Sequence, residues 1–323
     1  MGHKLSVGSF FAGVGGIDVG LEQTGKFETV YANEFDIYAA KTFELNSSLK
    51  VDTRDIVTVE SDNIPDFDVC AGGFPCQAFS VAGYRHGFND KHGRGTLFFE
   101  LARIIENKQP SIILLENVKN LETHDKGNTL KVILNTLHEL GYTTTYKVLN
   151  AMTHGNTPQN RERIYILGFV DPDACERFTF PDPTPLTTTL EDIIDFQAQL
   201  PDKYYYTPGK YKNNLYEHLE EAIDDDRAVY QWRRGYVRKN KSGVVPTLTA
   251  NQGTGGHNVS IVKTDSGIRK MTPRECFNAQ GFPESFILPE DMVDSRLYKQ
   301  AGNSVCVPVV RRLGEKIWEA LCG

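Results

Sequence analysis

The 323-residue sequence predicts an α/β fold: a doubly wound, mostly parallel sheet with a smaller, loop-rich second domain. Short apolar runs, such as residues 111–115, alternate with segments whose apolar residues recur at helical spacing, as in parallel sheets buried on both faces. A glycine-rich turn follows the first run at residues 13–16. After Asp171, prolines and a threonine run break this alternation, and little periodicity returns before Val305.

The predicted elements follow in order along the chain. Strands are expected at residues 4–11, 29–33, 68–71, 111–115, 143–149 and 163–170, with a further one ending near Asp55 and Ile56. Helices are expected at residues 17–24, 97–105, 130–140 and 307–321. The chain is expected to divide into a first domain at residues 1–180, a second domain at 181–295 and a segment at 296–323 that returns to the first domain. Ligands of such a sheet bind at the carboxyl ends of its strands.

The composition predicts a soluble, intracellular protein without a membrane partner. No apolar run reaches the roughly 18 to 20 residues of a membrane span, and the N-terminus lacks a signal-peptide core. Lys and Arg number 35 against 42 Asp and Glu, a formal net charge of -7 that argues against nucleic acid. The charge is uneven, however, because an acidic cluster at 217–226 precedes a basic, aromatic-rich stretch at 227–241 that suits phosphate contact.

The six cysteines form no Cys-x-x-Cys pair, so neither a disulfide framework nor a metal site is expected. Cys76 differs from the others because it follows Pro75 at a glycine-rich strand end and precedes Gln77 and Ser80. A thiol in such a polar loop is a candidate nucleophile. The other five cysteines are interpreted as small packing residues.

The glycine turn, with Phe11 before it and Glu34 after the next strand, has the features of a nucleotide site. Bare backbone lets a ligand approach, and a carboxylate can accept ribose hydroxyls. Asp18 stands where the dinucleotide fingerprint has its third glycine, so a nucleoside without phosphates, such as S-adenosylmethionine, fits better than NAD. Taken alone, the turn is equally consistent with tight packing.

Glu116 ends the 111–115 strand and is expected on the same rim as Cys76, which predicts covalent catalysis with an acid partner. Arg161 and Arg163 lead into the next strand, where alternation would turn both guanidinium groups toward one ligand. Alternatively, Glu116 is a solvated glutamate at a strand end, and Arg161 and Arg163 are a pair of charges on a solvated edge strand.

Together these residues resemble the DNA (cytosine-5)-methyltransferases of the bacterial restriction-modification type. The similarity covers nearly the whole chain and is weakest at about residues 182–245. The segments that carry it are Phe11-Ala12-Gly13-Val14-Gly15-Gly16, Asn33-Glu34-Phe35-Asp36, Gly73-Phe74-Pro75-Cys76-Gln77, Arg94-Gly95-Thr96-Leu97-Phe98, Glu116-Asn117-Val118, Gln159-x-Arg161-x-Arg163, Arg274-Glu275-Cys276 and Gly302-Asn303-Ser304-Val305. The resemblance implies a Rossmann-like methyltransferase fold, with cofactor binding and catalysis in residues 1–180 and target recognition in 181–295.

The resemblance implies a site for S-adenosylmethionine, which leaves as S-adenosylhomocysteine, and no metal. Glu34 would hold the ribose, Phe35 would stack on the adenine, and residues 303–305 would close over the amino-acid end. The implied cofactor residues are Phe11, Val14, Gly15, Gly16, Glu34, Phe35, Asp55, Ile56, Pro75, Leu97, Asn303, Ser304 and Val305.

The resemblance also implies a mechanism. The Cys76 thiolate would add to carbon 6 of a cytosine flipped out of duplex DNA, while Glu116, with a raised pKa, bonds ring nitrogen 3. Arg163 would bind the cytosine carbonyl oxygen, and Arg161 would position the ring or backbone. The implied DNA-binding residues are Gln77, Ser80, Arg94, Gln159, Arg233, Arg234, Arg238, Lys239, Thr247 and Thr249.

The resemblance further implies a monomer acting on DNA in a bacterial cytoplasm, or one encoded by a phage, with a cognate restriction endonuclease as functional partner. One alternative is an RNA (tRNA) cytosine-5 methyltransferase of the same fold, although the Cys-Phe-Thr signature of that branch is absent. A catalytically silent DNA-binding relative would not need Cys76, Glu116 and Arg163. A nicotinamide-dependent oxidoreductase leaves the thiol unexplained.

Overall fold

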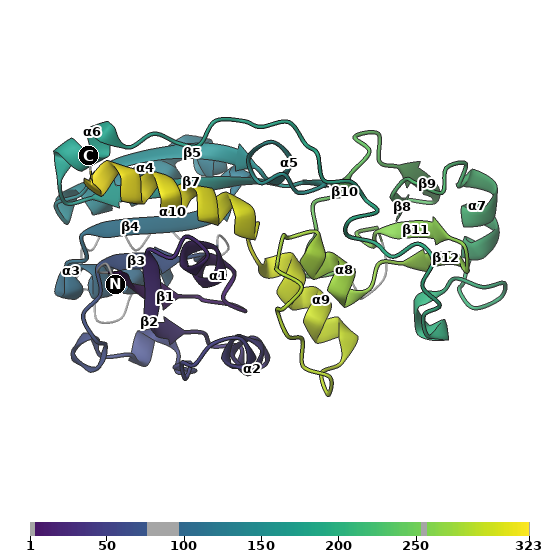
Figure 1. The fold of residues 1–323 in the computed structure, drawn as a ribbon, viewed down its shortest axis with the longest axis horizontal. Helices are drawn as coiled ribbons and strands as arrows, with labels where there is room; N and C mark the ends of the chain where they lie inside the picture. Colours follow the sequence, from purple (N-terminus) through teal and green to yellow (C-terminus); the bar gives the residue numbers. More distant parts are fainter. Residues whose placement is uncertain (1–3, 76–96, 253–256, 323) are drawn as a thin grey trace. The chain divides into compact units, whose positions relative to one another are not determined.

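The computed structural model describes residues 4–75, 97–252 and 257–322. The chain divides into two compact units. The first consists of Met1–Leu149, Glu162–Asp182 and Val309–Gly323, and the second of Asn150–Arg161 and Pro183–Pro308. Each unit contains its own sheet, and the colours of Figure 1 follow the chain through both.

The first unit is built on a six-stranded sheet in the order β2-β1-β3-β4-β7-β5. The strands are β1 (Leu5–Phe10), β2 (Phe27–Asn33), β3 (Val69–Gly72), β4 (Ile112–Val118), β5 (Thr143–Asn150) and β7 (Glu162–Phe169). β1 pairs in parallel with β2 and β3, β3 pairs in parallel with β4, and β7 runs antiparallel to β4. This mostly parallel sheet confirms the predicted fold class.

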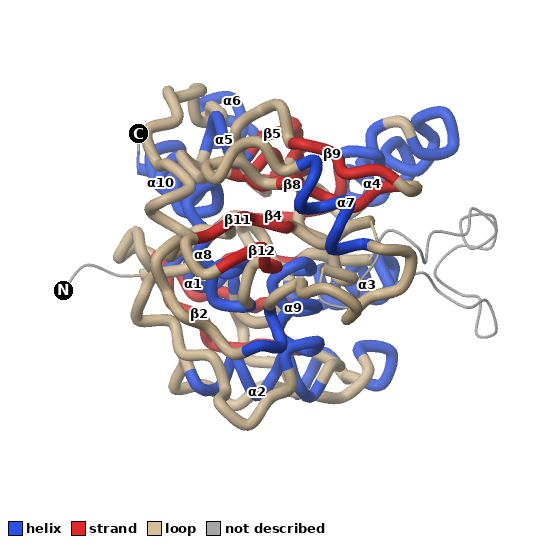
Figure 2. Tube along the Cα trace, turned by 90° about the vertical axis from the view of Figure 1, so that its right-hand side faces the viewer, coloured by secondary structure: helices blue, strands red, loops and turns tan. Residues whose placement is uncertain are grey.

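Helices cover the sheet of the first unit on both faces (Figures 1 and 2). They are α1 (Gly16–Glu22), α2 (Ile37–Leu45), α3 (Leu97–Lys108), α4 (Asn128–Glu139), α6 (Pro172–Arg177) and α10 (Val307–Cys322). α3 and α4 bury Leu101 and Ile133 in one core cluster with Leu115 of β4. The neighbouring strand residue Leu114, which points to the other face, is equally buried, so that face is covered too.

The strand predicted near Asp55 and Ile56 is wrong. In its place, Asn33 and Asp52 form a single bridge, and a 3-10 turn follows at Ile56–Thr58. The Asp55 side chain accepts a hydrogen bond from Val57 N at 3.2 Å. An aspartate that bonds a nearby backbone amide in this way favours a turn over a strand.

The second unit has more regular structure than the sequence predicts. Its four-stranded sheet runs β12-β11-β8-β9, and β6 pairs in parallel with β10. The elements are α5 (Ala151–His154), β6 (Gln159–Asn160), α7 (Leu215–Ala222), β8 (Tyr230–Arg233), β9 (Tyr236–Lys239), β10 (Val245–Pro246), β11 (Ile261–Thr264), β12 (Gly267–Lys270), α8 (Pro273–Asn278) and α9 (Asp294–Asn303). Most of these strands and helices are too short to show a clear period in sequence.

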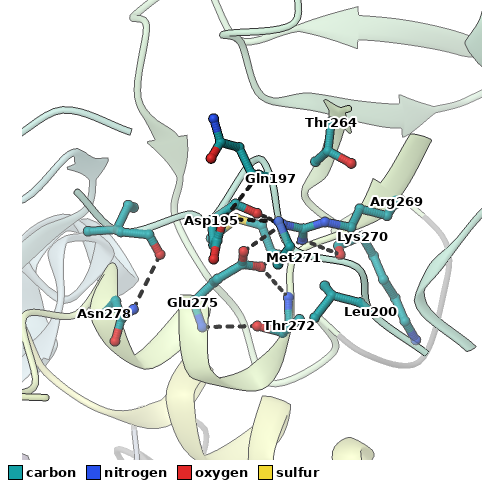
Figure 3. A network of polar contacts seen from close by, with 12 residues as sticks. Asp195, Gln197, Leu200, Thr264, Arg269, Lys270, Met271, Thr272, Glu275 and Asn278 are labelled. Carbon is teal, nitrogen blue, oxygen red and sulfur yellow. Dashed lines mark hydrogen bonds and ion pairs between the residues drawn. The ribbon is translucent and has the colours of Figure 1, made fainter. Parts of the chain in front are cut away.

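A buried ion pair fixes the start of α8 (Figure 3). The fully buried Arg269 guanidinium donates to both carboxylate oxygens of Glu275, at 2.8 and 2.7 Å. Glu275 also accepts from Thr272 N, and its own amide donates to Thr272 Oγ1, which completes a capping box. Arg269 further donates to the carbonyl of Asp195 at 2.9 Å. The ion pair therefore joins β12, α8 and the loop that contains Asp195.

Candidate active site

The glycine turn that follows β1 has an unusual backbone. Phe11, Gly13 and Gly15 all have positive φ, at 52°, 58° and 85°, and Gly15 is the N-cap of α1. Because Phe10 pairs with Asn33, the turn lies level with the end of β2. The first residues after both strands therefore meet on one rim of the sheet.

Glu34, the first residue after β2, is oriented by backbone donors on this rim. Its carboxylate accepts hydrogen bonds from Gly13 N at 2.8 Å and from Asp36 N at 2.7 Å. The next residue, Phe35, is 69% exposed, an unusual state for a phenylalanine. A fixed carboxylate beside an exposed aromatic ring and a bare turn fits a nucleoside, since the carboxylate can accept ribose hydroxyls and the ring can stack on a base.

The other predicted cofactor residues have varied surroundings. Val14 and Ile56 are buried, and so are Gly15 and Gly16, whereas Asp55 and Pro75 are exposed and Leu97 is half-buried. Asn303, Ser304 and Val305 belong to the second unit, where Asn303 is exposed and the other two are buried.

Asp18 lies under the glycine turn and is 3% exposed. Its carboxylate accepts hydrogen bonds from Ser9 Oγ of β1 and Thr29 Oγ1 of β2, both at 3.0 Å. Burial raises the pKa of Asp18 to about 7, although the two hydroxyls act in the opposite direction. The sequence showed only that Asp18 replaces a glycine, whereas the structure makes it a tie between β1 and β2.

The segment that leads into Cys76 runs beside Glu116. A Cβ atom added to Gly73 would lie 3.4 Å from Glu116 Oε2, within van der Waals contact, so the backbone of Gly73 passes close to this carboxyl group. Asn117 Nδ2 donates to the carbonyl of Phe74 at 2.8 Å and holds the segment from the other side. Cys76 itself, with Gln77, Ser80 and Arg94, lies outside the described residues.

Glu116 and Arg163 form an ion pair on neighbouring strands. Arg163 Nε lies 3.0 Å from Glu116 Oε1, and Glu116 is 9% exposed. Arg163 Nη1 also donates to the carbonyl of Glu162 at 2.8 Å. The register that sets Val118 opposite Arg163 brings the two charged groups together. A carboxyl group and a guanidinium group, side by side and mostly buried, can bind a ring nitrogen and a carbonyl oxygen of one heterocycle.

Arg161 has a different environment, and the expectation that it shares one strand face with Arg163 is wrong. Arg161 lies between β6 and β7, not in β7, and is 2% exposed. Its Nη1 donates to the carbonyl of Leu248 at 2.9 Å, and its Nη2 donates to the carbonyls of Gly302 and Ser304. The arginine therefore ties together two distant segments of the second unit.

Gln159 is fully buried beside Arg161. Its Nε2 donates to the carbonyl of Ala279 at 2.7 Å, and its Oε1 accepts from Leu248 N at 3.0 Å. Thr247 Oγ1 donates to the carbonyl of Asn160 at 2.6 Å. Gln159 thus holds Leu248 in place, between Thr247 and Thr249, two of the predicted DNA-binding residues.

A polar cavity of about 280 Å³ lies in the second unit. It brings together four of the predicted DNA-binding residues, Arg233, Arg238, Thr247 and Thr249, and leaves out Arg234 in the exposed hairpin turn. The full lining is Asn160, Gln231, Arg233, Arg238, Asn240, Pro246, Thr247, Thr249 and Asn258. Asn160 was not singled out by sequence reasoning, although it lies between Gln159 and Arg161.

Lys239, another predicted DNA-binding residue, is engaged by the acidic cluster. Its Nζ lies 3.0 Å from Asp225 Oδ2 and 3.1 Å from Asp224 Oδ1. Hydrogen bonds to Asp225 and Asp224 raise the pKa of Lys239. Two residues of the acidic cluster therefore form ion pairs with the basic stretch that follows it.

Three of the cysteines interpreted as packing residues are buried, namely Cys70, Cys276 and Cys306. Burial raises the pKa of Cys70 and of Cys276 well above the ordinary value, which suppresses their thiolates. Among the described residues, no group of His, Cys, Asp and Glu has the arrangement of a metal site. Their helices include none with the length and apolarity of a membrane span.

Comparisons with known proteins agree with this geometry. The family described as C-5 cytosine-specific DNA methylase matches residues 5–319. The chain is 56% identical to the Type II methyltransferase M.Bsp6I of Bacillus sp. (strain RFL6), over 98% of this chain and 99% of that protein. It is 42% identical to the Type II methyltransferase M.SsoII of Shigella sonnei, over 96% of this chain and 79% of that protein.

A solved structure, a Spodoptera frugiperda DNMT2 mutant, shares the fold with a TM-score of 0.73 and 20% identity, over 98% of this chain and 100% of that one. At this identity the likeness concerns the fold alone. The chain belongs to the C-5 cytosine-specific DNA methylases and is a DNA cytosine-5 methyltransferase of the restriction-modification type.

Proposed function

We propose that the chain methylates carbon 5 of one cytosine within a specific duplex sequence, using S-adenosylmethionine as methyl donor and Cys76 as nucleophile. The observation that carries this proposal is the Glu116–Arg163 pair at 3.0 Å, beside which Gly73 lies three residues before Cys76 in the sequence. A carboxyl group and a guanidinium group side by side suit binding of a cytosine ring, and a thiol would supply the nucleophile for addition to it.

In this proposal the Cys76 thiolate adds to carbon 6 of a cytosine that has swung out of the stack. Glu116 bonds ring nitrogen 3 and Arg163 binds the carbonyl oxygen, so that charge developing on the ring is stabilised. Carbon 5 becomes nucleophilic and takes the methyl group. Loss of the carbon 5 proton and departure of the thiolate then restore the aromatic ring.

The cofactor supplies an electrophilic methyl group when it is bound. Glu34 would accept the ribose hydroxyls, because its carboxylate is already fixed by Gly13 N and Asp36 N. Phe35, exposed at the strand end, would stack on the adenine. We assign residues 1–180 and 296–323 to this site and residues 181–295 to target recognition.

The cellular setting is part of the same proposal. We place the protein in a bacterial cytoplasm, acting as a monomer on DNA, where it protects host DNA from a cognate endonuclease. Type II methyltransferases among its relatives support this setting. No resident metal is required by the chemistry.

The experiment that tests the proposal compares Cys76→Ser with wild type in methyl transfer from labelled S-adenosylmethionine to duplex DNA. Cys76→Ser is expected to lose turnover and to keep DNA binding, while the matched control Cys322→Ser, at an exposed cysteine, keeps both. DNA with 5-fluorocytosine should trap a covalent complex in wild type and in Cys322→Ser, but not in Cys76→Ser. Equal transfer by Cys76→Ser would overturn the nucleophile, and transfer to RNA alone would favour the RNA alternative.

A further inference from the structure

The β8–β9 hairpin presents two chemically different faces. Gln231 pairs with Arg238 across the ladder and Arg233 pairs with Tyr236, so these four side chains share one face. The alternate residues Tyr230, Trp232 and Val237 pack in the apolar cluster that includes Leu219 of α7. Lys239 shares that second face with them and meets the acidic cluster there.

The first face forms one wall of the 280 Å³ polar cavity, to which Gln231, Arg233 and Arg238 contribute. Arg233 is half-buried, and its Nε atom is buried without a hydrogen-bond partner among the described residues. Among those same residues, neither Arg233 nor Arg238 has an ion pair to a carboxylate within 4 Å. A buried guanidinium donor without an acceptor is costly unless a ligand supplies one.

The rest of the lining identifies the kind of acceptor. Asn160, Asn240 and Asn258 are amides, and Thr247 and Thr249 are hydroxyls. Such groups both donate and accept hydrogen bonds, whereas a phosphate offers only acceptors and is best matched by donors alone. A base edge carries both kinds of group, and a guanidinium group matches the O6 and N7 acceptors of guanine in the major groove.

We propose that this cavity receives the major-groove edge of a guanine in the recognition sequence, with Arg233 as the residue that reads it. The inference rests on the proposed function, because it assumes that the second unit contacts target DNA. Arg238, exposed at the mouth of the same cavity, extends this face toward the neighbouring base pair or backbone. Lys239 takes no part in the readout, since it lies on the opposite face.

The test uses methylation of a duplex library with randomised sequence, mapped at base resolution, for wild type, Arg233→Lys and Arg233→Gln. Lysine keeps the charge but loses the planar fork. Both variants are expected to lose about 10- to 100-fold of the preference for guanine at one position of the site. The matched control Lys263→Gln, which removes a charge from the exposed side of β11, should keep the wild-type preference.

A second measurement separates base readout from phosphate contact. Replacing that guanine by 7-deazaguanine removes the N7 acceptor. The replacement should therefore weaken DNA binding by wild type and cause little further loss of binding by Arg233→Lys. If Arg233 contacts phosphate instead, Arg233→Gln will weaken binding to all DNA sequences equally, and Arg233→Lys will bind as wild type does. The slope of the logarithm of the binding constant against the logarithm of salt concentration will then be smaller by about one for Arg233→Gln. That pattern overturns the inference while methylation by wild type keeps the proposed function intact. Loss of DNA methylation by wild type itself would instead refute the proposed function.

Discussion

Arg163 Nε lies 3.0 Å from Glu116 Oε1, and both residues come from adjoining antiparallel strands, β7 and β4. The carboxylate thus has a fixed cationic neighbour before any substrate is bound. A cytosine entering the site would meet the pair as one unit, with its ring nitrogen on the carboxyl side and its carbonyl oxygen on the guanidinium side.

Glu116→Gln should keep the fold and lower the single-turnover rate of methyl transfer by about 10²- to 10⁴-fold, because the amide cannot exchange a proton with the ring. The control is Lys119→Gln, which breaks the exposed Lys119–Glu162 pair at the same edge of the sheet and should leave the rate unchanged. Rapid-quench kinetics at saturating DNA provides the measurement. A wild-type rate in Glu116→Gln would remove Glu116 from the chemistry.

Arg161 is expected to act through structure and not through contact with the base. Arg161→Met leaves the carbonyls of Leu248, Gly302 and Ser304 without their donors and should lower the free energy of unfolding by about 3 kcal/mol. Arg161→Lys should not restore it, since an ammonium group cannot span three acceptors. Urea unfolding measures the loss, with the surface variant Arg311→Gln as the control. A stable Arg161→Met with a reduced kcat would instead assign the residue a catalytic role.

Gly302→Ala should be among the most damaging single substitutions in the second unit. A Cβ atom there would overlap the backbone carbonyl group of Thr249, which cannot move as a side chain would. We expect little folded protein, or a large drop in Tm by calorimetry. The control is Gly25→Ala, whose Cβ meets nothing within 4 Å and whose φ of 72° costs only about 1 to 2 kcal/mol. Equal Tm values for the two variants would contradict the close approach.

Asp18 should make stability depend on pH. Its pKa is raised by burial from 3.8 to about 7, so the folded state binds a proton that the unfolded state has already released between those values. Stability is therefore fully present below the lower pKa and falls as pH rises to about 7, by on the order of 4 kcal/mol. Asp18→Asn should flatten this slope in denaturant unfolding between pH 4 and 8. The exposed variant Asp62→Asn should leave the slope as in wild type, and an unchanged slope in Asp18→Asn would contradict the raised pKa.

The residues at the strand ends could be placed from the sequence, because the carboxyl ends of parallel strands lie at the same edge of a sheet. The positions of Glu34 and Glu116 follow from apolar runs that each end in a carboxylate. The partners of Arg161 did not follow, because all three are backbone carbonyls, between 87 and 143 residues away, and any residue type supplies a carbonyl. The antiparallel direction of β7 could not be predicted either, because a buried strand has the same apolar sequence pattern in both directions.

The second unit was harder to predict. Its strands β8 and β9 hold four residues each, so alternation is visible only once their register is known. The register places Arg238 on the face with Gln231 and Lys239 on the face with Tyr230, although the two basic residues are adjacent and could not be distinguished by sequence. The engagement of Lys239 by Asp224 and Asp225 depends on packing of α7 against the hairpin, which a charge pattern does not reveal.

Helix α10 has a consequence for how the protein matures. A Cβ atom at Gly314 would contact Leu21, Thr24 and Phe27, so α10 packs against elements that a ribosome makes much earlier than the helix itself. At a synthesis rate of about 5 to 20 residues per second, the apolar partners of α10 wait many seconds before they are covered. The first unit therefore completes its core only when residues 309–322 are available, so its catalytic fold cannot finish forming before α10 has been synthesised.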